Sequence, residues 1–249
     1  MRLVNCIISI SLFFSAAFCN GCNFNTQNNG LSCNIDLSYK GLSNTKNLLK
    51  DKEDKFIALT FDDGPSYTTT SAIVDVLEAH ELKATFFLLG ERLNKKTYNV
   101  VKRIHETGSE IGNHSWSHRK LTSLSSDEQF QELEKTNAAI SKIIKKDIKW
   151  FRPPYGCHNQ NVIKHVNSLN MYSILWTIDS LDWQNDKPEV LVKRVINNVH
   201  NGAIVLLHDH ERKSNTLKAL PEIITTLKKS GYRFVTLSEW EEEICDLVR

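Results

Sequence analysis

The sequence predicts an incomplete (β/α) barrel, and three observations lead to this fold class. From Phe56 onward, short apolar runs alternate with amphipathic segments, which is typical of a parallel sheet with helices on its outside. About seven apolar runs occur in the chain, too few for a complete eightfold barrel. No GxGxxG motif follows the first run, which disfavours a doubly wound dinucleotide-binding sheet and leaves an open sheet as the alternative. We therefore expect a small or incomplete barrel of about seven parallel strands.

The elements follow from this alternation in chain order. The expected strands are Phe56–Phe61, Ala84–Leu89, Glu110–Asn113, Ile148–Phe151, Tyr172–Ile178, Ala203–Leu207 and Arg233–Thr236. The expected helices are Thr69–His80, Asn99–Thr107, Ser126–Lys145, Asn159–Ser168, Pro188–His200 and Thr216–Lys229. Ser125 or Ser126 begins the long third helix, and Gln129 is placed to complete a capping box.

Composition excludes several classes of protein. The 249 residues are 41% hydrophobic and 24% charged, which is ordinary for a globular protein and excludes a disordered, fibrous or multi-span membrane chain. The net charge of +2 gives no support for a nucleic-acid partner. It suits an uncharged substrate such as a sugar polymer.

The N-terminus predicts secretion. Arg2 precedes a mostly apolar run, Leu3–Phe18, that ends in small residues, as in a secretory signal peptide. We assign residues 1–19 to this signal, with cleavage after Ala17 or Cys19, and expect a secreted or cell-wall protein with no other membrane contact. An uncleaved anchor and a lipoprotein are the alternatives. Residues 20–54 are rich in Asn, Ser, Thr, Gly and Lys, which predicts an N-terminal extension before a domain at 55–249.

Four cysteines remain after cleavage, namely Cys22, Cys33, Cys157 and Cys245. In an oxidising compartment an even set is expected to form disulfides. Cys22 with Cys33 would close a short loop and leave Cys157 with Cys245. Metal binding by these four is disfavoured because no CxxC pair occurs.

Metal-ligating residue types follow two of the expected strands. Asp62 and Asp63 end the first strand, and His114 and His118 follow the third. In barrels of this type the chemistry lies at the C-terminal strand ends. Two histidines four apart converge on one metal if the stretch turns helically. Asp63, His114 and His118 would leave coordination positions open for water and substrate, with zinc the natural ion and cobalt or another divalent ion the alternative.

The remaining strand ends also carry polar or aromatic residues. Arg152 precedes a proline-stiffened loop that contains Tyr155, and it could pair with an aspartate at the barrel mouth. Asp182 stands beside Trp183, a combination that suits sugar contact. His208 is the first polar residue after an apolar strand. Each feature alone has a structural explanation, but five strand ends on one side of the barrel predict an active site.

Five segments in this order, TFDDGP, HSWSH, RPPYG, DSLDW and LLH, resemble the motifs of the polysaccharide deacetylases, the fourth family of carbohydrate esterases. The resemblance covers roughly Phe56 to Thr236 and implies a distorted β/α barrel, so residues 55–249 would be the catalytic domain. It implies that Asp63, His114 and His118 hold the metal and that Asp62 is the general base.

The same resemblance implies roles for the remaining motif residues. Arg152 would orient Asp62, and the Tyr155 backbone N–H would hold the oxyanion. His208 would protonate the leaving amine, and Asp182 would tune it. Trp183 and Leu206 would flank the acetyl methyl group.

The expected function is removal of N-acetyl groups from N-acetylglucosamine polymers or oligomers, with chitin as the leading substrate. The run from Trp176 to Trp183 is similar to chitin deacetylases. Peptidoglycan deacetylase and acetylxylan esterase are the enzymatic alternatives. The alternative from another class is an inactive carbohydrate-binding protein on the same fold, which would commonly lack a metal ligand or the base.

Overall fold

The fold is described from a computed structural model, which covers residues 45–50, 52–184, 187–211 and 214–248. The predicted signal peptide and residues 20–44 of the predicted extension lie outside these ranges. None of the described helices is long and apolar enough to cross a membrane.

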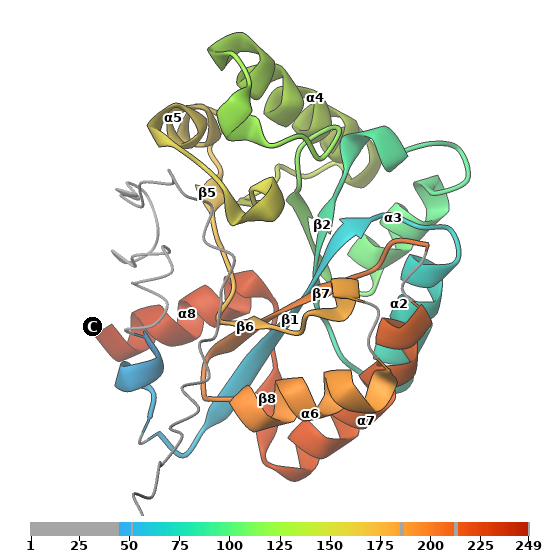
Figure 1. The fold of residues 1–249 in the computed structure, drawn as a ribbon, viewed down its shortest axis with the longest axis vertical. Coiled ribbons are helices and arrows are strands. Elements are labelled where there is room, and N and C mark those ends of the chain that lie inside the picture. Colours follow the sequence, from blue (N-terminus) through green and yellow to red (C-terminus); the bar gives the residue numbers. More distant parts are fainter. Residues whose placement is uncertain (1–44, 51, 185–186, 212–213, 249) are drawn as a thin grey trace, which may run out of the picture.

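The described strands form one curled sheet in which all pairs are parallel, as predicted (Figure 1). Their order is β5-β4-β3-β2-β1-β7-β6, and β8 pairs with the beginning of β1. The strands are β1 (Lys55–Gly64), β2 (Thr85–Leu88), β3 (Glu110–Asn113), β4 (Trp150–Phe151), β5 (Tyr172–Ser173), β6 (Ile178–Asp179), β7 (Ala203–His208) and β8 (Tyr232–Phe234).

The predicted strand Tyr172–Ile178 is two strands, β5 and β6, and this division explains why the barrel is distorted. Residues 172–173 pair with β4 at one edge of the sheet, and residues 178–179 pair with β7 at the other. One short segment therefore bridges both edges, with hydrogen bonds from Ile174 N to Phe151 O (2.9 Å) and from Thr177 N to Ile204 O (2.9 Å). The apolar run alone does not reveal that its two halves pair with different strands.

Alternate residues of β1 contribute to two cores, as the two-residue period of a strand requires. Ile57, Leu59 and Phe61 pack with the helices outside the sheet. Phe56 and Ala58 belong to an interior cluster that also contains Trp150 and Trp240 from other elements.

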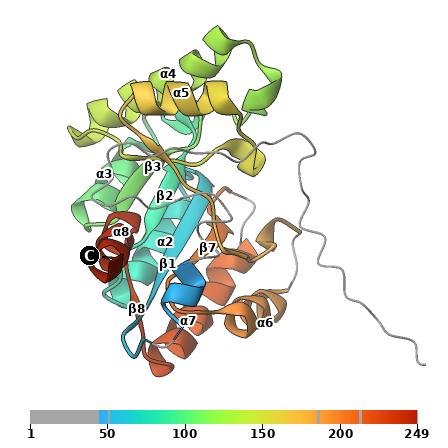
Figure 2. The ribbon, with the colours of Figure 1, turned by 90° about the vertical axis from the view of Figure 1, so that its left-hand side faces the viewer.

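The helices surround the sheet, as Figures 1 and 2 show. They are α2 (Thr69–Ala79), α3 (Tyr98–Glu106), α4 (Ser126–Ile144), α5 (Gln160–Ser168), α6 (Pro188–Asn198), α7 (Ser214–Lys229) and α8 (Leu237–Val248). Short 3-10 turns, η1 (Gly90–Arg92), η2 (Leu121–Ser123), η3 (Pro154–Gly156) and η4 (Asp182–Gln184), lie in the connections.

Helix α8 was not predicted, although it closes the N-terminal end of the barrel. Leu237, Trp240 and Ile244 pack into the interior cluster, and the Trp240 indole donates to Gly202 O (2.9 Å). Their spacing of three and four residues is the helical signal in an otherwise acidic segment.

The capping box of α4 forms with a different residue from the one predicted. Ser125 is the N-cap, and its hydroxyl and backbone N–H exchange hydrogen bonds with Glu128. Gln129 is buried instead, and its amide donates to Leu121 O (3.0 Å) and Leu124 O (3.1 Å).

The predicted Cys157–Cys245 pairing is wrong: Cys245 is disulfide-bonded, but Cys157, which is buried, is not its disulfide partner. Cys22 and Cys33 lie outside the described residues, and their pairing stays a prediction.

Candidate active site

A bulge at the end of β1 turns two adjacent aspartates toward the barrel mouth. The register against β2 pairs Asp62 with Phe87 and Gly64 with Leu88, so Asp63 is the extra residue. Asp63 has a positive φ of 74°. In a regular strand the two carboxylates would point to opposite faces, and the bulge removes this conflict.

The histidine pair converges through a loop rather than through the helical turn that the spacing suggested. Residues 114–118 form no helix, and Ser115 (φ 71°) and His118 (φ 58°) are left-handed. His118 N donates to Ser115 Oγ (3.1 Å), which closes the loop. The expectation of convergence is met, but its predicted geometry is wrong.

Asp63, His114 and His118 form the group of described residues best suited to hold a metal ion. One ligand atom from each lies within 4.8 Å of the others. Asp63 Oδ1 lies 3.5 Å from His114 Nε2 and 3.2 Å from His118 Nε2.

Two observations indicate that the donor atoms of this triad suit a cation. His114 Nδ1 lies 2.7 Å from Arg152 O, so it donates to that carbonyl and leaves the lone pair on Nε2 facing Asp63. Asp63 Oδ1 is buried without a hydrogen-bond donor, as expected for an atom that receives a cation.

The charges of the triad agree with this fit. Burial and the neighbouring His114 lower the pKa of His118 to about 4, so its imidazole is neutral at neutral pH. Burial opposes ionisation of Asp63, but His114, His118 and His208 outweigh it and hold its pKa below the ordinary value. Burial also opposes the charge on His114, but Asp62 and Asp63 raise its pKa, so cation binding would displace a proton.

Asp62 is paired with Arg152, as expected. Arg152 is fully buried, and its Nη1 donates to Asp62 Oδ1 (2.9 Å) and to Thr60 Oγ1 (2.7 Å). Arg152 also donates to Ile174 O (3.4 Å) and Leu175 O (2.9 Å). These four hydrogen bonds fix the planar guanidinium, so Asp62 is held in one orientation.

His208 and Asp182 form a second hydrogen-bonded pair. His208 Nδ1 lies 2.6 Å from Asp182 Oδ1, and His208 N donates to Asp182 Oδ2 (2.9 Å). Thr216, in α7, donates to Asp182 Oδ2 (2.6 Å). Burial lowers the pKa of His208, but Asp182 outweighs it and raises the pKa to about 9. Burial likewise opposes the charge on Asp182, and the bond from His208 holds its pKa below the ordinary value.

Of the three residues expected to contact substrate, Tyr155 touches the triad, and Trp183 and Leu206 are close in the chain to Asp182 and His208. Tyr155 is 63% exposed, and its ring packs against that of His118 with 4.6 Å between centroids. Trp183 is 49% exposed in η4. Leu206 is buried on β7, two residues before His208 and therefore on the same strand face. Their proposed roles toward the acetyl group stay predictions.

Asp209 is a buried carboxyl group for which sequence reasoning gave no role. Its N–H donates to Asp62 O (3.0 Å), and Thr70 Oγ1 donates to its Oδ2 (2.6 Å). Burial, together with Asp62 and Asp63, raises its pKa to about 7. A Cβ at Gly64 would lie 2.4 Å from Asp209 Oδ2, which explains the glycine there.

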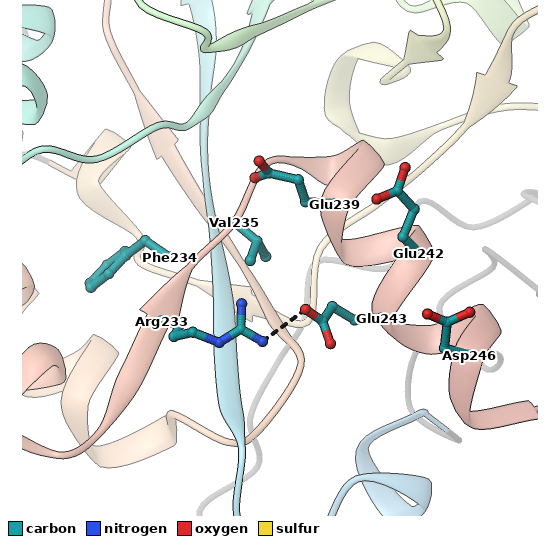
Figure 3. A pocket seen from close by; sticks show the side chains of 7 residues that line it. All are labelled: Arg233, Phe234, Val235, Glu239, Glu242, Glu243 and Asp246. Atoms are coloured by element: carbon teal, nitrogen blue, oxygen red, sulfur yellow. Dashed lines mark hydrogen bonds and ion pairs between the residues drawn. The ribbon is translucent and has the colours of Figure 1, made fainter.

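A pocket of about 300 Å³ lies away from this centre, between β8 and α8 (Figure 3). It contains none of the predicted site residues, and Arg233 in its wall is ion-paired with Glu243 (2.8 Å). Since β8 pairs with the beginning of β1 and Asp62 is near its end, the pocket is at the opposite end of the barrel.

Comparison with known proteins gives a family match over the same motifs. Residues 49–174 match the family model described as polysaccharide deacetylase. A peptidoglycan-N-acetylglucosamine deacetylase of Bacillus cereus is 39% identical over 189 residues, covering 75% of this chain and 88% of that protein. A bifunctional xylanase/deacetylase of Pseudobutyrivibrio xylanivorans is 38% identical over 76% of this chain, and this match spans only 31% of that protein's length.

Solved structures share the fold. The CE4 domain of a multidomain xylanase from the hindgut metagenome of Trinervitermes trinervoides has a TM-score of 0.72 and 38% identity, over 77% of this chain and 91% of that one. A CE4 family pseudoenzyme from Bacillus anthracis has a TM-score of 0.70 and 36% identity, over 76% of this chain and 66% of that one. The motif order, the curled parallel sheet and these matches agree, and the chain belongs to the polysaccharide deacetylase family.

Proposed function

We propose that this protein is a metal-dependent deacetylase that removes N-acetyl groups from N-acetylglucosamine polymers, with chitin as the leading substrate. One observation carries the proposal: Asp62, held by the buried Arg152, lies beside the triad of Asp63, His114 and His118. His208, held by the buried Asp182, is the register partner of Asp62 on the adjacent strand. This arrangement provides a proton acceptor, a proton donor and a cation site for amide hydrolysis.

Asp62 acts as the general base in this proposal. Its Oδ1 is engaged by Arg152, while Oδ2 lies 3.7 Å from His114 Nε2 and therefore beside the triad. A divalent cation bound by the triad would lower the pKa of water and polarise the acetyl carbonyl. Asp62 Oδ2 is placed to take the proton from the attacking water.

His208 acts as the general acid. Amines leave poorly unless they are protonated, and the pKa of about 9 keeps His208 protonated at neutral pH. Because Nδ1 is bonded to Asp182, Nε2 is the nitrogen that can deliver the proton.

The substrate assignment rests on the mouth of the site and on the relatives. Tyr155 and Trp183 expose aromatic surface there, which suits sugar rings. The names of the relatives include peptidoglycan-N-acetylglucosamine deacetylase and bifunctional xylanase/deacetylase, so peptidoglycan and acetylxylan are the alternatives to chitin. We also propose that the chain is secreted, since its first residues match a signal peptide.

An inactive carbohydrate-binding protein is the second candidate, because the family includes a pseudoenzyme. The presence here of the base, the acid and all three metal-ligand positions favours the enzyme.

The experiment measures acetate release from chitin oligomers, peptidoglycan and acetylxylan with added Zn²⁺ or Co²⁺, and again after chelation. We expect metal-dependent release that is fastest on chitin oligomers and absent in the His118→Ala variant, while Asp127→Asn, an exposed change on α4, keeps full activity. Faster acetate release from peptidoglycan would contradict chitin as the leading substrate but would agree with metal-dependent deacetylation. Binding of oligomers without acetate release from any substrate would favour the carbohydrate-binding alternative.

A further inference from the structure

The loop that contains His114 and His118 is hydrogen-bonded to one buried side chain of α4, Glu132. Glu132 Oε2 accepts hydrogen bonds from Trp116 N (2.9 Å) and Ser117 N (2.8 Å). Its Oε1 accepts a third bond from Ser117 Oγ (2.6 Å). Successive backbone N–H groups that point at one carboxylate form an anion-binding nest, and charged acceptors strengthen such bonds.

The loop needs this restraint because its backbone is strained. Ser115 and His118 both have positive φ, a conformation that costs free energy in residues other than glycine. The ligand separation between His114 and His118 therefore depends on groups outside the loop that stabilise this shape.

Helix α4 supplies further contacts around the same loop. The Lys135 ammonium lies 3.6 Å from the centroid of the Trp116 ring. Asn113, just before His114, donates to Leu133 O (2.9 Å) and to Asn137 Oδ1 (2.8 Å). Glu132 makes three hydrogen bonds to the loop. Each of the other α4 residues named here makes a single contact.

We propose that Glu132 is a positioning residue that holds His114 and His118 at the separation needed to share one metal ion. The inference rests on the proposed function, because it assumes that the triad binds a divalent cation. Loss of an outer partner of metal ligands typically weakens metal binding about 10–100-fold.

The test measures Zn²⁺ and Co²⁺ dissociation constants of the full-length protein by competition with a chromophoric chelator, together with thermal unfolding of the metal-free protein. Glu132→Ala should bind metal about 10–100-fold more weakly. Glu132→Gln should recover most of the affinity, because an amide oxygen accepts the two backbone bonds and the amide N–H₂ can donate to Ser117 Oγ.

Two variants of α4 separate positioning from helix stability. Ser125→Ala removes the helix cap and should lower the unfolding temperature without changing the dissociation constant. Glu134→Ala makes the same chemical change two residues further on, about 200° around the helix. It should change neither the dissociation constant nor the unfolding temperature.

The outcomes are distinguishable. If the wild-type protein binds neither ion, the proposed function fails and the inference with it. If the wild type binds metal and Glu132→Ala binds it equally well, the inference alone is wrong. If Glu132→Gln binds metal as weakly as Glu132→Ala although it unfolds at the wild-type temperature, hydrogen bonding by residue 132 does not position the ligands.

Discussion

Asp62 on β1 and His208 on β7 are direct register partners in the sheet. Paired residues of adjacent parallel strands point to the same face, so the proposed base and acid project together from two hydrogen-bonded strands. Their spacing is therefore fixed by the sheet rather than by mobile loops.

The acid form of His208 should persist to unusually high pH. Its pKa is about 9 in the metal-free protein, above the ordinary 6.5, because Asp182 outweighs burial. The stability that this pair contributes is thus fully present below pH 6.5 and is lost as pH rises through about 9. An NMR titration of the metal-free protein should show one histidine with a pKa near this value that is missing in His208→Ala. Titration of every histidine below pH 7.5 would contradict the assignment.

Replacing Asp182 tests what maintains that pKa. In Asp182→Asn the partner charge is lost while His208 stays buried, so the pKa of His208 should fall by more than about one unit. The alkaline limb of kcat on an amide substrate should move to lower pH by the same amount. Thr216→Val is the matched control, since it removes one hydrogen bond from Asp182 and keeps the charge. An unchanged pH profile in Asp182→Asn would show that another group governs it.

Two neighbouring carboxylates should respond differently to the same substitution. Asp62→Asn should retain bound metal and lose about 10²–10⁴ in kcat, because it removes only proton transfer. Asp63→Asn should also lose metal, because Asp63 Oδ1 lies beside both histidines. Metal content and acetate release are measured on both variants. The assigned roles are wrong if both variants keep their metal and their activity.

The sequence predicted which residues gather at the strand ends better than it predicted the local backbone that places them there. Asp63, His114 and His118 were expected together because parallel strands bring their C-terminal ends to one edge. The bulge at Asp63 and the left-handed residues of the histidine loop were not predicted, since they depend on distant contacts such as those of Glu132.

Dependence on contacts between distant segments also explains the errors in the predicted fold. The Tyr172–Ile178 run has one apolar pattern, and only its pairing with β4 and then β7 divides it. Glu132, Asp209 and Thr216 act through partners far away in the chain, so no local motif marks them.

Leu49 tests where the folded domain begins. It precedes the predicted boundary at residue 55, yet it is fully buried beside Gly202, and Asn201 Nδ2 donates to its carbonyl (3.3 Å). Leu49→Ala should lower the free energy of unfolding by about 2–5 kcal/mol, because it removes buried methyl groups and leaves a cavity. Leu48→Ala is the matched control, since Leu48 is 47% exposed and its loss should cost no more than about 0.5 kcal/mol. Urea unfolding measures both variants. Equal stabilities would mean that residues 45–50 do not belong to the cooperative core, and the domain would then begin at β1.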